Sequence, residues 1–244
     1  KGQVRDSQKL DGKFDVYFHG GRSSLETKGS SYLWSYQNDR YGDDSQMLTY
    51  QLAPGSAIEV MTMESTYLKQ DYAEFPAIRT SKGGHEALFG QIIYPLGKGD
   101  AKPVIDDIST EKLLGAKISY GDKQDVFLKS HTEKTSSNAG IQFSGDFAWI
   151  SLTSDIIKKA AGQSIKNFTY QGSPILTADQ RITFAMEWGP KIELGLSVER
   201  TANVTVNPRK PISSITLNGD DVPFEMTDGS VKFEVSQSGN YILN

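Results

Sequence analysis

Apolar and polar residues alternate with a period of two in short blocks along most of the chain. The clearest block spans residues 191–199, in which the apolar positions are Ile192, Leu194, Leu196 and Val198. Successive side chains of a β-strand point to opposite faces, so this alternation predicts a strand with one buried and one solvated face. We expect the four apolar residues on the buried face, and Lys191, Glu193 and Glu199 in solvent.

Similar blocks recur between turn-forming residues, which favours a protein built from short antiparallel strands. They cover residues 14–18, 48–52, 147–152, 204–206 and 231–235. Residues 88–94 carry apolar side chains at both odd and even positions, which predicts a strand covered on both faces. The pairs Asn218-Gly219 and Asp228-Gly229 stand between short apolar runs and predict two hairpins.

Helical signals are scarce. Residues 154–161 form the one credible helix, with Ser154 or Asp155 as the N-cap and Gly162 as the stop. The predicted fold class is therefore all-β, a large antiparallel β-sandwich with at most one or two short helices.

The chain is long enough for one large β domain, and we expect a single sandwich domain over residues 1–244. Residues 207–211, Asn-Pro-Arg-Lys-Pro, are the best linker candidate. The stretch that follows is too short for a core of its own, so residues 208–244 are expected to form at most a small C-terminal β appendage that packs onto the main sandwich.

Composition narrows the functional classes. The chain has no cysteine, which excludes disulfides and thiolate chemistry, and its net charge of −4 argues against a nucleic-acid partner. No apolar run approaches the roughly 18 residues of a membrane span. The sequence contains no recognised metal-binding or cofactor-binding motif, so we expect neither a metal nor a cofactor. The chain opens at Lys1 with no visible signal peptide, which indicates a processed chain or a fragment.

An aromatic strand and its surroundings form the strongest candidate binding site. Three aromatic residues alternate along it and share one face, with basic and polar residues close by in the sequence. Aromatic faces stack on the C–H faces of sugars, and arginine pairs with carboxylates, so this combination suits an acidic carbohydrate. The candidate substrate-binding residues are His19, Arg22, Tyr32, Trp34, Tyr36, Arg40 and Tyr41.

Each of these candidates has a structural alternative. Core burial is the usual fate of an aromatic stripe, so these aromatics also fit one side of a sandwich core, and His19 also fits a hydrogen-bonded surface or edge histidine. The adjacent pairs Asp106-Asp107 and Asp220-Asp221 point to opposite faces if they lie on strands, so neither is a catalytic dyad. No catalytic residue is assigned.

The order of the predicted strands resembles that of heparinase II/III-type polysaccharide lyases, including their alginate-lyase relatives. The resemblance begins with the strand that ends in Phe18-His19 and the aromatic strand around Trp34. It continues through Leu-Thr-Tyr-Gln-Leu-Ala-Pro at 48–54, Ala-Leu-Phe-Gly-Gln-Ile-Ile-Tyr-Pro-Leu at 87–96, Phe-Ala-Trp-Ile at 147–150 and Phe-Thr-Tyr-Gln-Gly at 168–172.

This resemblance implies that the chain is the C-terminal, non-catalytic β-sandwich of a bacterial lyase. Such enzymes cleave uronic-acid polysaccharides by β-elimination, so the implied partners are an acidic polysaccharide or oligosaccharide and an N-terminal helical domain of the same protein. The implied location is periplasmic or extracellular. Two alternatives stay open: a stand-alone carbohydrate-binding module, and a cell-surface β-sandwich interaction domain.

Overall fold

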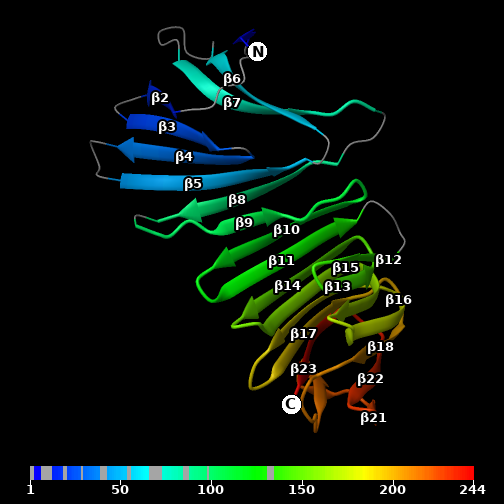
Figure 1. Cartoon of the computed structure of the whole chain (residues 1–244). Helices are drawn as coiled ribbons and strands as arrows, with labels where there is room; N and C mark the ends of the chain where they lie inside the picture. The colour runs from blue at the N-terminus through cyan, green and yellow to red at the C-terminus, as the bar shows by residue number, and fades with distance from the viewer. Residues whose placement is uncertain are drawn as a thin grey trace. The chain divides into compact units, whose positions relative to one another are not determined.

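The computed structural model shows an all-β protein (Figure 1). It describes residues 3–6, 13–18, 21–28, 30–38, 43–53, 56–65, 73–84, 88–97, 99–130 and 135–244. Within these ranges the regular elements are strands, without a helix, and neighbouring strands pair antiparallel. The predicted all-β, antiparallel fold class is therefore confirmed. The described part of the chain also holds no helix that is long and apolar enough to cross a bilayer.

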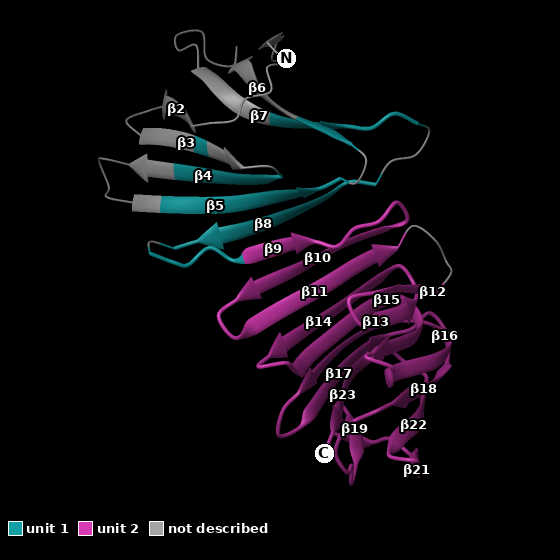
Figure 2. Cartoon of the chain, viewed as in Figure 1, with its two compact units in different colours: residues 1–103 teal, residues 104–244 magenta. Residues whose placement is uncertain are grey.

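The chain separates into two compact units, residues 1–103 and residues 104–244 (Figure 2). A single sandwich domain is the expectation for residues 1–244, and the division into two compact units is a finding of the structure. Residues 208–244, expected as a possible appendage, belong to the second unit.

The first unit contains a three-stranded and a five-stranded sheet. The three-stranded sheet has the order β1-β6-β7, with β1 Gln3–Asp6, β6 Ala57–Ser65 and β7 Ala73–Ser81. The five-stranded sheet has the order β2-β3-β4-β5-β8, with β2 Lys13–Phe18, β3 Gly21–Lys28, β4 Ser31–Asn38, β5 Asp43–Leu52 and β8 Gly90–Leu96. Leu25 and Tyr32 of the larger sheet form a buried cluster against Ile58 and Ile78 of the smaller one. The two sheets therefore share a core.

Strand β8 corrects one expectation. The sequence predicted a strand covered on both faces, but Ile92 is buried while its neighbour Ile93 is 58% exposed. Apolar side chains at consecutive positions thus do not guarantee two covered faces, because isolated apolar residues are common on protein surfaces.

The second unit holds the remaining strands. Its first half contains β9 Val104–Asp107, β10 Leu113–Tyr120, β11 Lys123–Ser130, β12 Thr135–Asn138, β13 Ile141–Ser144, β14 Phe147–Thr153 and β15 Ile156–Tyr170. Its second half contains β16 Ser173–Trp188, β17 Ile192–Ser197, β18 Ala202–Val206, β19 Ile215–Leu217, β20 Asp220–Asp221, β21 Phe224–Thr227, β22 Ser230–Val235 and β23 Gly239–Leu243.

Two long strands carry the sheet of this unit from one layer to the other. The first part of β15 pairs with β14, whereas its last part pairs with β13. Strand β16 pairs first with β18 and then with β17. The pairing of β15 with β16 is interrupted between Gly162 and Asn167, and such irregularities bend a sheet sharply. One layer therefore runs β20-β19-β23-β17-β16-β15-β14-β11-β10-β9, and the other contains β12, β13, β18, β22 and β21.

The core lies between these two layers. Phe233 of β22 packs against Tyr241 of β23, with ring centroids 5.5 Å apart. Phe168 and Phe184, from the two long strands, meet edge to face at the same centroid distance of 5.5 Å. Both ring pairs belong to one continuous buried cluster, which gives the second unit the packing of a β-sandwich.

Strand β17 agrees with its prediction. Ile192, Leu194 and Leu196 are buried, and Val198 packs at the margin of the core. Lys191, Glu193 and Glu199 are exposed. Both hairpins are confirmed as well: β19–β20 turns at Asn218-Gly219 and β21–β22 at Asp228-Gly229, all four residues with positive φ.

The predicted helix over residues 154–161 is wrong. Ser154 and Asp155 have φ of 48° and 63° and form the turn of the β14–β15 hairpin. In the pairing of β14 with β15, Leu152 stands opposite Ile157 but Ser151 stands opposite Lys159, so β15 has one extra residue at this point. After the buried Ile157, the next buried residue of β15 is therefore Ala160. This irregularity places buried residues three apart, and the strand thereby imitates the spacing of a helix.

Candidate functional site

The aromatic stripe predicted to bind sugar lies partly in the core of the first unit. Tyr32 is 3% exposed and packs against Leu25, so its ring offers no open face to a ligand. Trp34 is half-buried against the same cluster, and its indole Nε1 donates a hydrogen bond of 3.2 Å to Thr49 Oγ1. These two residues follow the structural alternative, in which the stripe is one side of a core.

For the other predicted binding residues the structure says less. Arg22 lies in strand β3 and Tyr36 in strand β4, and at both positions the structure describes the backbone alone. His19, Arg40 and Tyr41 lie outside the described residues. Sugar binding by these five residues stays a prediction.

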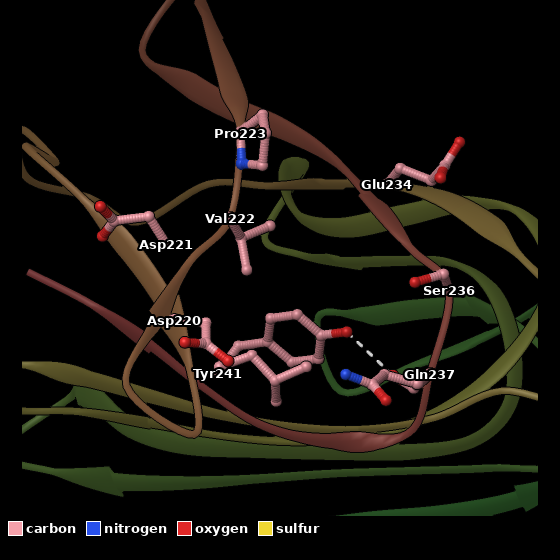
Figure 3. A pocket seen from close by; sticks show the side chains of 9 residues that line it. Asp220, Asp221, Val222, Pro223, Glu234, Ser236, Gln237 and Tyr241 are labelled. Carbon is pink, nitrogen blue, oxygen red and sulfur yellow. Dashed lines mark hydrogen bonds between the residues drawn. The ribbon is translucent and has the colours of Figure 1, made fainter.

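A surface cavity in the second unit is a candidate site among the described residues (Figure 3). Its volume is about 420 Å³, within the range of pockets that bind small ligands. It lies between the β19–β20 hairpin and the connection from β22 to β23. The lining residues are Leu217, Asp220, Asp221, Val222, Pro223, Glu234, Ser236, Gln237 and Tyr241.

Local backbone features hold both walls of this cavity in place. On one side the tight turn at Asn218-Gly219 reverses the chain, and the backbone N–H of Val222 donates a 2.8 Å hydrogen bond to the carbonyl of Ile215. On the other side the hydroxyl of Ser238 accepts a 3.0 Å bond from the N–H of Val198 and donates a 3.3 Å bond to its carbonyl. Both walls are therefore attached to the edge of the sandwich.

Tyr241 forms the floor. Its side chain is 1% exposed, and its hydroxyl donates a 2.8 Å hydrogen bond to the backbone carbonyl of Gln237. Burial raises the pKa of Tyr241, so the phenol keeps its proton and remains a donor at neutral pH. Tyr241 thus positions the wall of the cavity and offers a ligand little ring surface.

Polar side chains flank this floor. Figure 3 shows Asp220 and Gln237 on opposite sides of the Tyr241 ring, whereas the side chains of Asp221 and Glu234 extend away from it. Lysine, arginine and histidine are absent from the described residues that line the cavity. The arrangement supplies hydrogen-bond acceptors from a carboxylate together with an amide that both donates and accepts.

The cavity contains no assembled metal centre. Across the described ranges, His, Asp and Glu side chains nowhere gather in threes with a geometry that would hold a metal ion. The cavity also lacks a cation that would neutralise a substrate carboxylate. The described lining therefore offers hydrogen-bonding groups and apolar surface.

Sequence reasoning noticed Asp220 and Asp221 only as an adjacent pair and did not single out Gln237 or Tyr241. The predicted Asn218-Gly219 hairpin was the one available signal. The opposite wall begins well downstream in the sequence, so only the pairing of β19 with β23 brings the two walls together.

The comparisons add no relative: no protein-family model and no curated protein matches this chain.

Proposed function

We propose that this chain is a non-catalytic, glycan-binding β-sandwich of a heparinase II/III-like polysaccharide lyase, whose substrate is an acidic, uronic-acid polysaccharide. The observation that carries the binding role is the cavity in which Asp220 and Gln237 flank the buried Tyr241. The lyase context rests on the order of strands that resembles that family.

The cavity has the composition that sugar recognition requires. Carboxylates and amides bind neighbouring hydroxyl groups through paired hydrogen bonds, and both types are present in Asp220 and Gln237. Val222 and Pro223 add apolar surface against which the C–H groups of a sugar ring pack. The described lining carries carboxylates and no basic side chain, so in this proposal the cavity binds the hydroxyl groups of the glycan and not its acidic groups.

In this proposal the cavity binds the glycan and does not cleave it. β-Elimination on a uronide requires a base, an acid for the leaving oxygen and a group that neutralises the carboxylate. The lining of the described cavity supplies carboxylates without a cation. In this proposal the chain supports the substrate and a helical domain of the same protein performs the reaction, in the periplasm or outside the cell.

A stand-alone carbohydrate-binding module is the second candidate function. It is favoured by one observation: the cavity is lined entirely by residues of the second unit, between Leu217 and Tyr241. A site completed within one unit does not require another domain for binding.

Calorimetric titration of the chain with uronate oligosaccharides and with their carboxyl-reduced, neutral counterparts tests the binding role. We expect both to bind, and Gln237→Ala and Asp220→Ala each to weaken both by about threefold to tenfold, the worth of one or two hydrogen bonds. Asp228→Asn is the matched control, because Asp228 is an exposed turn residue outside the cavity and asparagine tolerates its positive φ. Unchanged binding in both cavity variants contradicts the proposal.

A further inference from the structure

Arg209 and Trp188 form a second feature of the second unit. Arg209 lies in the loop after β18, and its guanidinium carbon is 5.2 Å from the centroid of the Trp188 ring. Trp188 ends β16 and packs at the margin of the core. Arginine over an indole face is a favourable cation–π arrangement, which holds the guanidinium in a defined place.

The loop backbone fixes this position further. The N–H of Arg209 donates a 3.1 Å hydrogen bond to the side-chain oxygen of Asn207, and Arg209 has a φ of 61°. Left-handed backbone is unfavourable for a residue with a long side chain and is often found where function demands it. The structure thus accepts backbone strain at the residue that presents the guanidinium.

The guanidinium has no anionic partner among the described residues. It lies over the Trp188 ring and close enough to Tyr170 to interact with it electrostatically, and the buried indole Nε1 of Trp188 lacks a hydrogen-bond acceptor among the described residues. The neighbouring Lys210 differs, since its ammonium donates to the carbonyls of Gly189, at 3.3 Å, and Pro190, at 2.6 Å. Lys210 therefore attaches this loop to the β16–β17 connection, whereas the guanidinium of Arg209 is left without an anionic partner among the described residues.

Titratable groups of both kinds lie around Arg209. Partial burial lowers the pKa of Arg209 and the nearby Tyr170 raises it, but a guanidinium stays charged at neutral pH. Lys191 is exposed in the adjacent β16–β17 loop, and Asp155 is a neighbouring acid that acts on Tyr170. A partly desolvated cation without a counter-ion is costly, and a bound anion removes that cost.

We propose that Arg209, held over Trp188, is an anion-binding subsite that takes the planar carboxylate of a uronic-acid residue. The fork of N–H groups on a guanidinium matches the two oxygens of a carboxylate, which gives a bidentate contact. This inference rests on the proposed function for the identity of the ligand as an acidic glycan. It adds the charge recognition that the Asp220–Gln237 cavity lacks.

The test titrates the full chain with a uronate oligosaccharide, its carboxyl-reduced counterpart and inorganic phosphate, at constant ionic strength. Arg209→Gln is expected to weaken uronate binding by about tenfold or more, the worth of a charged hydrogen-bonded pair. Binding of the carboxyl-reduced sugar is expected to stay unchanged. Arg200→Gln is the matched control, because Arg200 is an exposed arginine in the β17–β18 connection. It is expected to bind every probe as the unchanged chain does.

A second variant guards against a structural effect. Arg209→Lys keeps the charge and loses the fork, so it is expected to weaken uronate binding by about threefold or more while the circular dichroism spectrum stays the same. Wild-type uronate affinity in both Arg209 variants overturns the subsite. Equal loss of phosphate and uronate binding in Arg209→Gln overturns its selectivity for carboxylate.

The two proposals fail in different ways. Loss of uronate binding in Arg209→Gln, with Gln237→Ala and Asp220→Ala unchanged, supports the subsite and overturns the cavity. Loss of binding to both sugars in the cavity variants, with unchanged binding in Arg209→Gln, supports the cavity and overturns the Arg209 subsite.

Discussion

The hydroxyl of Tyr241 donates a 2.8 Å hydrogen bond to the backbone carbonyl of Gln237. This bond joins strand β23 to the loop that forms one wall of the cavity, and it is made by a side chain with 1% exposure. The phenol also packs against Phe233 across the two layers. One buried residue therefore couples the core of the sandwich to the geometry of the candidate site.

Replacing Tyr241 by phenylalanine tests this coupling. Tyr241→Phe keeps the ring and removes the donor, so we expect a loss of about 0.5–1.5 kcal/mol in the free energy of unfolding. Urea denaturation measures the loss. A fully stable Tyr241→Phe variant would contradict a structural role for the bond.

The raised pKa of Tyr241 also predicts a loss of stability in alkali. The folded chain holds the phenolic proton more tightly than the unfolded chain. Stability is therefore fully present below the ordinary tyrosine pKa of about 10 and falls as pH rises through the higher folded value. Thermal unfolding from pH 8 to 11 should show a steeper fall for the unchanged chain than for Tyr241→Phe. Tyr170, whose pKa is also raised by burial, contributes equally to both chains.

Leu194 tests the assignment of the buried face of β17. Its side chain is 0% exposed and stands opposite Met186 on one side and Tyr241 on the other. Leu194→Ala should cost about 2–5 kcal/mol in unfolding free energy, because it leaves a cavity in a packed core. Glu193→Ala, at the exposed neighbouring position, is the control and should stay within about 0.5 kcal/mol. A near-neutral Leu194→Ala would show that the register is wrong.

Two glycines of the same sheet, on the strands that flank β16, should respond oppositely to alanine. A Cβ at Gly162 would collide with Ile165 and lie 2.9 Å from Cε1 of Phe184, so Gly162→Ala should cost about 1–3 kcal/mol. At Gly195 the nearest atom to such a Cβ is the carbonyl oxygen of Ala185 at 3.7 Å, an ordinary contact. Gly195→Ala should be neutral or slightly stabilising. Melting temperatures that fall equally in both variants would contradict this packing.

The C-terminal strands should be indispensable to the second unit. A chain that ends at Asn207 lacks β19–β23, which exposes the buried β17 residues that pair with β23 and the β18 residues that pair with β22. We expect a lower melting temperature or loss of solubility. If the shortened chain melts at the same temperature as the full chain, residues 208–244 are an independent appendage after all.

The chain by itself should not turn over a uronic-acid polysaccharide. Absorbance of the unsaturated uronide product, followed with heparin, heparan sulfate, alginate and hyaluronan, is expected to stay flat, because base, acid and carboxylate-neutralising group must meet at one carbon. Sustained product formation that disappears in His19→Ala would instead identify a complete enzyme.

The sequence determined the fold class because strand alternation is local. The spacing of Ile192, Leu194 and Leu196 predicts which face of their strand is buried, and Asn218-Gly219 predicts a turn. Neither prediction needs information about residues that are distant in the sequence. The same local reasoning failed at residues 154–161. There a pairing irregularity, which depends on the register with β14, produced a helix-like spacing of Ile157 and Ala160.

Tertiary structure alone decided where the sites lie. The sequence could not tell whether Tyr32 faces solvent or a second sheet, because both positions demand the same alternation along its own strand. It also could not place Asp220 and Gln237 on the two sides of the Tyr241 ring, or Arg209 over Trp188. These residues lie on segments that are separated along the chain and come together only when the strands of the second unit pair and its two layers pack.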